Sequence, residues 1–190
     1  MVEIIFYGRG GQGSVTAADV LATSAFLEGK YAQSFPSFSG ERRGAPVMAF
    51  AKIADQYFAD RSKILKADYA IVLDPNLLKT VRPLNNMKEG GCAILNLDRS
   101  SEEVKKEFNT SGIEIICVDA SAISEEVYGK RPMPIVNMAM LGTFAAVSGL
   151  VKIKSIMLGI DKYFSGSRAE EAKKTAAMAY ERTGGMKKAW

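Results

Sequence analysis

The sequence contains no histidine and only two cysteines among its 190 residues. Without histidine, the chain cannot carry a Ser-His or Cys-His catalytic pair or a histidine-ligated metal. Cys92 and Cys117 lie far apart, whereas a structural zinc site takes about four ligands, usually in close pairs. If the protein takes part in chemistry, we therefore expect the reactive groups to belong to a cofactor or to another chain, and we predict no metal site.

Long apolar segments are also scarce. The uncharged run 132–151 contains Pro132, Pro134 and Asn137, which leaves a helix of about fourteen residues, or roughly 20 Å. A hydrocarbon layer is about 30 Å thick, so this run predicts a buried core helix and no membrane contact. The first residues, MVEIIFYG, lack the basic region of a signal peptide. With both cysteines interpreted as reduced core residues, we expect a cytoplasmic protein.

Composition and charge suit one globular domain. Hydrophobic residues make up 47% and charged residues 24% of the chain, which excludes a disordered class. The net charge is +4, and it gathers at the C-terminus. Residues 152–190 hold nine Lys/Arg against four Asp/Glu. This surplus could meet an acidic partner or a phosphate-bearing ligand, but a solvated helix face is the usual explanation. Because the basic residues are dispersed and no binding motif accompanies them, we do not predict a nucleic-acid partner.

Two hydrophobic periods alternate along the chain, one typical of strands and one typical of helices. The predicted strands are 2–7, 31–35, 47–53, 69–73, 92–97 and 114–118. The predicted helices are 15–29, a short one after Asp74-Pro75, 102–108, 120–128, 136–147, 153–163 and 168–182. Several strands are almost continuously apolar, which indicates a mostly parallel sheet covered on both faces. The predicted fold is therefore a three-layer α/β domain.

A glycine-rich motif follows the first predicted strand. Gly8, Arg9, Gly10, Gly11, Gln12 and Gly13 match G-x-G-x-x-G between a strand and a helix. Such a loop lets the backbone approach a phosphate at a helix N-terminus. The acid that binds a ribose about twenty residues further on is missing, because the second strand, KYAQSF, has no acid at its end. Three interpretations stay open: a phosphate or anion site, a turn that serves only strand–helix packing, and an NAD site.

The loop SFSGERRGAP, residues 37–46, is the second unusual segment. It places Glu41, Arg42 and Arg43 between two glycines, just after two phenylalanines. Guanidinium groups pair well with carboxylates and phosphates, so the loop predicts a contact with a partner or ligand. The alternative is a local ion pair between Glu41 and an arginine on a solvated loop, worth at most ~1 kcal/mol.

Two further features are weaker. Asp74 lies between a strand and a helix, where ligands of parallel sheets gather, although an N-cap role is the preferred interpretation. Asn137, Met138 and Met140 open an apolar helix. We interpret these methionines as core residues rather than an interface.

Taken together, the strand–GRGGQG–helix opening, the stretch QSFPSFSGERRGAPVMAF and the segment VLDPNLL resemble one protein family. They are similar to the gamma subunit of the pyruvate/2-oxoacid:ferredoxin oxidoreductases, and the resemblance runs from Ile4 to about Tyr180. It implies that residues 1–190 form a single gamma-type domain. The form GERRGAPV looks more like the pyruvate and branched-chain branch than the 2-oxoglutarate branch.

The resemblance implies a reaction in which 2-oxoacid, coenzyme A and oxidised ferredoxin become acyl-CoA, CO2 and reduced ferredoxin. The complexes of this family use thiamine diphosphate, magnesium and iron–sulfur clusters. This sequence has no cysteine array for a cluster and no G-D-G…N signature for thiamine, so we predict an accessory subunit with no catalytic residue and no cofactor of its own. The implied partners are alpha, beta and ferredoxin-like delta subunits.

The resemblance also implies a role in subunit assembly and in coenzyme A handling. We place these roles on Gly8–Gly13 and on Glu41, Arg42 and Arg43. The alternative function is a stand-alone nucleotide-binding module or NAD(P) dehydrogenase, against which the missing ribose acid and the missing histidine speak.

Overall fold

In the computed structural model, residues 1–37 and 44–184 are described. They form a six-stranded sheet with the strand order β2-β3-β1-β4-β5-β6. The strands are β1 (Val2–Arg9), β2 (Tyr31–Pro36), β3 (Pro46–Ala54), β4 (Ala67–Val72), β5 (Met87–Asn96) and β6 (Glu114–Val118). The helices are α1 (Ser14–Leu27), α2 (Leu77–Thr80), α3 (Ser101–Phe108), α4 (Ala120–Tyr128), α5 (Asn137–Ser148), α6 (Ile153–Tyr163) and α7 (Ser167–Gly184), with a 3-10 turn η1 at Pro83–Asn86.

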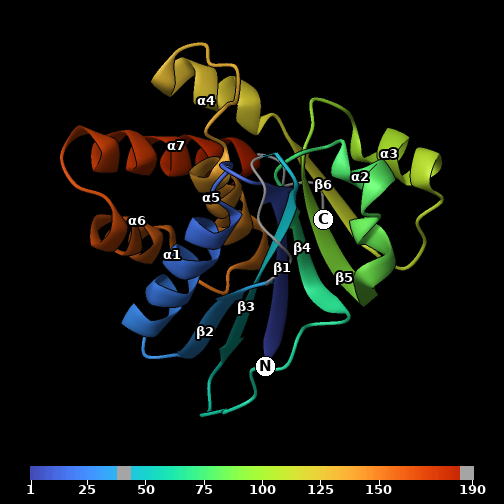
Figure 1. Ribbon diagram of the computed structural model, residues 1–190, viewed down its shortest axis with the longest axis horizontal. Helices are drawn as coiled ribbons and strands as arrows, with labels where there is room; N and C mark the ends of the chain where they lie inside the picture. The colour runs from blue at the N-terminus through green and yellow to red at the C-terminus, as the bar shows by residue number, and fades with distance from the viewer. Residues whose placement is uncertain (38–43, 185–190) are drawn as a thin grey trace.

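Helices cover both faces of the sheet, as the sequence predicted. Figure 1 shows α1, α5, α6 and α7 gathered on one side and α2 and α3 on the other. The alternation of β1 explains the two layers, because successive side chains of a strand point to opposite faces. Ile4 and Phe6 belong to the core under α1 and α5, whereas Ile5 and Tyr7 belong to the core under α2 and α3. The three-layer α/β prediction is confirmed.

The sheet is mostly parallel, with one inserted antiparallel strand. β1, β4, β5 and β6 pair in parallel. β3 lies between β1 and β2 and runs antiparallel to both. The strand that follows α1 is therefore one position further from β1 than a simple β-α-β unit would place it. The insertion arises because β2 and β3, which follow each other in the chain, pair in antiparallel orientation.

The predicted helices are present, with small shifts at their ends. α4 and α6 have the predicted bounds, and α5 begins one residue later. Ser100 caps α3 in a capping box with Glu103, and the Asp119 carboxylate accepts a hydrogen bond from the Ala122 N–H at the start of α4. Within the two described ranges, no helix has both the length and the apolarity that crossing a membrane requires.

An ion-pair network fastens the edge of the sheet where β1 begins. The fully buried Lys52 on β3 places its Nζ 2.6 Å from an oxygen of Asp60 and 3.6 Å from Glu3 on β1. Lys88 on β5 reaches Glu3 at 3.0 Å and Asp68 at 2.9 Å. The network links four strands, β1, β3, β4 and β5, and ties the loop after β3 to them. A buried lysine is costly unless it is paired, so we expect Asp60 to matter for stability.

The Asp60 pair should make stability depend on pH in the acid range. The hydrogen bond from Lys52, followed by those from Ser62, lowers the pKa of Asp60 from 3.8 to about 2. Because the folded-state pKa lies below the unfolded one, the contribution is complete above about pH 4 and is lost as the pH falls toward about 2. Asp60→Asn should therefore lower the melting temperature at neutral pH, and its difference from the wild type should shrink between pH 4 and pH 2. Thermal denaturation followed by circular dichroism measures this.

Asp55→Asn is the control, because Asp55 is an exposed carboxylate of the same loop. It should leave the melting temperature close to the wild-type value across this pH range. A difference between Asp60→Asn and the wild type that stayed constant from pH 7 to pH 2 would contradict the assignment to ionised Asp60.

Candidate functional site

The glycine motif forms the turn between β1 and α1. Gly8 and Arg9 still belong to β1, and Gly13 is the N-cap of α1. Gly11 and Gly13 have φ angles of 96° and 78°, which residues other than glycine rarely adopt. A Cβ at Gly8 would lie 2.2 Å from the Ser14 hydroxyl oxygen. Glycine is therefore required at these positions for local packing, whether or not a ligand binds.

Gln12 closes the turn onto Arg9. Its backbone N–H donates to the Arg9 carbonyl at 2.9 Å, and its side-chain oxygen accepts from the Arg9 N–H at 2.8 Å. The predicted site residue Gln12 thus has a structural role within the loop.

Arg9 joins the glycine motif to two other segments. Its Nε donates to an Asp74 carboxylate oxygen at 2.5 Å, and its Nη1 donates to the Gly44 carbonyl at 3.1 Å. Next to it, the Gly10 N–H donates to the Ala45 carbonyl at 3.0 Å. The guanidinium of Arg9 therefore holds together the ends of β1 and β4 and the segment that enters β3.

The N-cap interpretation of Asp74 is wrong. α2 begins at Leu77, and the residue at its N-cap is Asn76. Asp74 is buried and accepts from the Asn76 backbone N–H at 2.9 Å, in addition to the bond from Arg9. An aspartate side chain that accepts from a backbone N–H two residues on forms an Asx turn, and here this turn precedes the helix. The pairing with Arg9 was not predicted.

The N-termini of α1 and α5 meet beside the glycine motif. The side-chain nitrogen of Asn137 donates to the Gly13 carbonyl at 3.4 Å, and a Cβ at Gly13 would lie 2.4 Å from that nitrogen. Neither helix has a side-chain cap or an acidic residue in its first turn. Helix N-termini carry unsatisfied N–H groups and partial positive charge, so this edge of the sheet is suited to an anion.

Two nearby observations complete this edge. The Ser14 hydroxyl is buried and has no hydrogen-bond partner within the described part of the chain. Met138 and Met140 are fully buried in the core, which confirms their interpretation as core residues. Asn137 was predicted only as the residue that opens an apolar helix, and its contact with Gly13 was not predicted.

Glu41, Arg42 and Arg43 lie outside the described residues. The residues on either side of segment 38–43 are described, and both are anchored. The Ser37 N–H donates to the Met48 carbonyl at 2.9 Å, and the Gly44 carbonyl accepts from Arg9. The residues that flank segment 38–43 therefore lie at the same edge of the sheet as the glycine motif.

The sheet order bears on the NAD interpretation. A dinucleotide site uses an acid at the end of the strand that neighbours β1. Here β3 separates β2 from β1, and β2 ends in Phe35 and Pro36. Both the residue type and the strand position thus disfavour a dinucleotide site.

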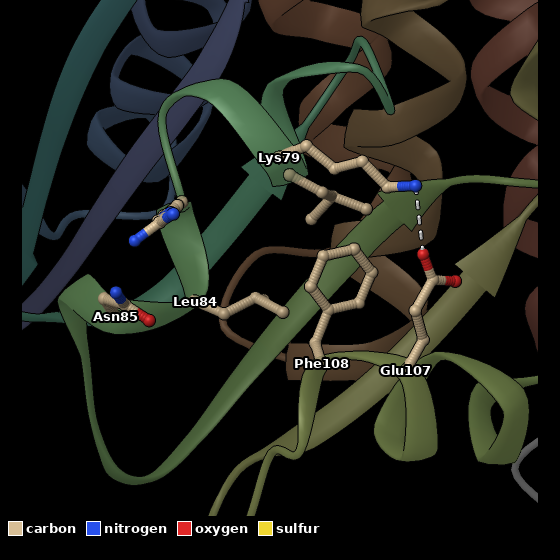
Figure 2. A pocket seen from close by; sticks show the side chains of 7 residues that line it. Lys79, Leu84, Asn85, Glu107 and Phe108 are labelled. Carbon is tan, nitrogen blue, oxygen red and sulfur yellow. Dashed lines mark ion pairs between the residues drawn. The ribbon is translucent and has the colours of Figure 1, made fainter.

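A hollow of about 390 Å³ lies on the other face of the sheet, between α2, η1 and α3. Figure 2 shows Leu84 and Phe108 lining it, with Lys79 and Glu107 facing each other across it. Lys79 pairs with Glu107 at 3.3 Å, and Arg99 pairs with the same carboxylate at 2.5 Å. Arg99 and then Lys79 lower the pKa of Glu107. Because Lys79 and Arg99 are both paired with Glu107, the hollow offers a ligand fewer unpaired polar groups than the glycine-motif edge does.

The described residues contain no group of three or more Cys, Asp or Glu side chains that could hold a metal ion. Burial raises the pKa of Cys92 to about 12 and also raises that of Cys117. A thiol that stays protonated is a poor nucleophile and a poor metal ligand. Neither cysteine is a candidate for chemistry.

Comparison with known proteins agrees with this architecture. Residues 3–182 match the model of the family described as pyruvate ferredoxin/flavodoxin oxidoreductase. The chain is 45% identical to the pyruvate/ketoisovalerate oxidoreductases common subunit gamma of Thermococcus litoralis over 183 residues, which cover 96% of this chain and 97% of the relative. It is 44% identical to the pyruvate synthase subunit PorC of Methanothermobacter thermautotrophicus, with 95% of each chain covered.

A solved structure of similar fold is the pyruvate oxidoreductase subunit PORC of Thermotoga maritima. It superposes with a TM-score of 0.80 at 32% identity and covers 95% of each chain. Family model, sequence relatives and fold all extend over nearly the whole chain. The chain belongs to the pyruvate ferredoxin/flavodoxin oxidoreductase family.

Proposed function

We propose that this chain is the gamma subunit of a 2-oxoacid:ferredoxin oxidoreductase that acts on pyruvate or a branched-chain 2-oxoacid. One observation carries the proposal: the chain matches a gamma subunit of a pyruvate/ketoisovalerate oxidoreductase at 45% identity over nearly the full length of both. The reaction converts 2-oxoacid, coenzyme A and oxidised ferredoxin to acyl-CoA, CO2 and reduced ferredoxin. Two electrons leave the 2-oxoacid, and the acyl group forms a thioester with coenzyme A.

The residues of this chain do not fit the redox and thiamine cofactors of such a complex. Within the described ranges no metal-binding cluster is present, and the sequence has neither a cysteine array nor a thiamine signature. Thiamine diphosphate, magnesium and the iron–sulfur clusters therefore belong to partner chains. We derive no reaction step from residues of this one.

The role that we assign to this chain is assembly and coenzyme A binding. Coenzyme A carries several phosphate charges, and the edge formed by Gly10–Gly13, Asn137 and Ser14 supplies helix N-termini without acidic neighbours. Gly44, which follows Glu41, Arg42 and Arg43 directly in the sequence, lies at the same edge, where its carbonyl accepts from Arg9. These features support a site for an anionic ligand or an acidic partner surface at this edge. The proposed partners are alpha, beta and delta subunits in the cytoplasm, with residues 1–190 acting as one domain.

Reconstitution tests the proposal. The chain, produced together with its thiamine-binding and iron–sulfur partner chains, should co-elute with them in gel filtration. The complex should reduce ferredoxin with pyruvate or 2-oxoisovalerate and coenzyme A. A preparation without this chain should lose assembly or coenzyme A-dependent turnover. If the chain instead migrates alone and reduces NAD with some substrate, the alternative dehydrogenase function holds.

A further inference from the structure

A pocket of about 340 Å³ lies where the end of α4, the start of α5 and the start of α7 meet. Figure 1 shows these three helices together at one end of the helical layer that contains α1 and α6. The apolar lining comes from Ile135, Met138, Phe164 and Ala172, of which Met138 and Ala172 are buried. Pockets of this size that combine an apolar lining with a few polar groups are typical small-molecule sites.

Two arginines lie at this pocket, and they differ in the polar contacts that they make within the described residues. Arg131 donates to the Tyr128 carbonyl at 3.3 Å and lies over the Tyr128 ring at 5.8 Å. For Arg168, the described residues provide no ion-pair partner and no side-chain hydrogen bond. Both side chains line the same pocket. A guanidinium presents several N–H donors in one plane and suits a carboxylate that accepts two of them.

The remaining polar groups of the pocket indicate which ligand charge it favours. Glu171 also lines the pocket, so the two arginines and one carboxylate leave a net charge of +1. Glu171 opposes a second negative charge on a ligand. Tyr128 stays a hydrogen-bond donor, because burial raises the pKa of its hydroxyl. The combination favours an anion with one charge over a phosphate ester with nearly two.

We infer that this pocket binds a small organic monocarboxylate with an apolar body, its carboxylate at Arg131 and Arg168 and its body against Met138 and Phe164. The site does not depend on the proposed function of the glycine motif. Asn137 belongs to both places, since it lines the pocket and contacts Gly13. A ligand in the pocket therefore lies one side chain away from the glycine motif.

Methyl NMR of the full chain tests this inference with phenylacetate as the probe. The Met138 methyl signal, assigned with Met138→Leu, should shift on titration to millimolar phenylacetate. Phenylacetamide has the same body without the charge, and acetate has the charge without the body. Phenyl phosphate carries a second charge. All three should bind at least several-fold more weakly than phenylacetate.

Charge variants provide the second measurement. Arg168→Gln should weaken phenylacetate binding about tenfold, the loss of one charge-assisted contact. Glu171→Gln should tighten it about two- to threefold, because a like charge is removed. A gain in affinity cannot arise from misfolding. Arg61→Gln removes the same charge from the exposed loop after β3 and should leave binding unchanged.

The inference is overturned if the Met138 signal does not move with phenylacetate. It is also overturned if Arg168→Gln and Arg61→Gln bind the probe equally well. Equal affinities for phenylacetate and phenyl phosphate would overturn the preference for a monoanion.

Discussion

Gly142→Ala should destabilise the protein by about 3 kcal/mol or more, although alanine is the better helix former. Gly142 lies in the middle of α5, where α7 crosses it closely. A Cβ built on Gly142 would lie 2.0 Å from the Ala176 carbonyl oxygen and 2.8 Å from its carbonyl carbon. Backbone atoms of a packed helix cannot rotate away as a flexible side chain can. The two helices must therefore separate, which opens the core around Phe144 and Ala176.

For a chain of this size, each kcal/mol corresponds to roughly 2–4 °C in melting temperature. We thus expect a fall of about 6–12 °C in thermal denaturation. Gly184→Ala is the matched control, because a Cβ there meets nothing within 4 Å, although Gly184 is also helical. That variant should be neutral or slightly more stable, since alanine is favoured over glycine in helices by up to about 1 kcal/mol. Equal melting temperatures for both variants would mean that α5 and α7 are not in close contact.

The close approach of α5 and α7 shows what periodicity cannot predict. Local pattern located α5 and α7 within a few residues, because the uncharged apolar run of α5 and the spaced apolar residues of α7 are properties of each segment itself. Whether a glycine lies where two helices cross depends on the partner helix. Here the partner, α7, lies more than twenty residues further along the chain than Gly142. The same limit applies to Gly159 on α6, where a Cβ would lie 2.2 Å from the Ser24 hydroxyl of α1.

The sheet illustrates a second limit. Alternating strands and helices predicted a mostly parallel sheet, and four strands obey this. β3 does not, because β2 and β3 are consecutive in the chain and pair with each other in antiparallel orientation. The position of β3 between β1 and β2 depends on pairing between segments that are distant in the sequence. The hydrophobic pattern of a single segment does not predict such pairing.

The loops of the candidate site were predicted from the sequence, but the contacts between their residues were not. The glycine motif was recognisable because its glycines permit a turn that other residues do not. The Arg9–Asp74 pair and the Asn137–Gly13 contact join residues 65 and 124 positions apart. Arg9 ends β1 and Asp74 follows the neighbouring parallel strand β4, so the strand order would have indicated that they meet. For Asn137 no comparable signal exists without the packing of α5 against α1.

Replacement of Arg42 or Arg43 should weaken coenzyme A binding in the reconstituted complex. Both residues lie outside the described part of the chain, and their assignment rests on the motif GERRG and on the anchoring of Gly44 to Arg9. If an arginine pairs with a coenzyme A phosphate, alanine removes a charge-assisted contact of about 1.5–3 kcal/mol. The apparent affinity for coenzyme A should then fall roughly 10- to 150-fold, while thiamine-dependent decarboxylation stays largely intact. Lysine should restore the charge but not the bidentate geometry, and leave a partial defect.

Gel filtration of the same variants separates ligand binding from assembly. If the arginines contact a neighbouring subunit, Arg42→Ala and Arg43→Ala should weaken the complex, and the difference from the wild type should shrink at high salt, because salt screens exposed charges that only the wild type retains. Arg61→Ala, which removes an exposed arginine from the loop after β3, should change neither measurement. Wild-type coenzyme A titrations and wild-type elution for both variants would leave only a solvated ion pair with Glu41. The glycine motif would then be the remaining candidate for the anion, since the N-termini of α1 and α5 meet there independently of segment 38–43.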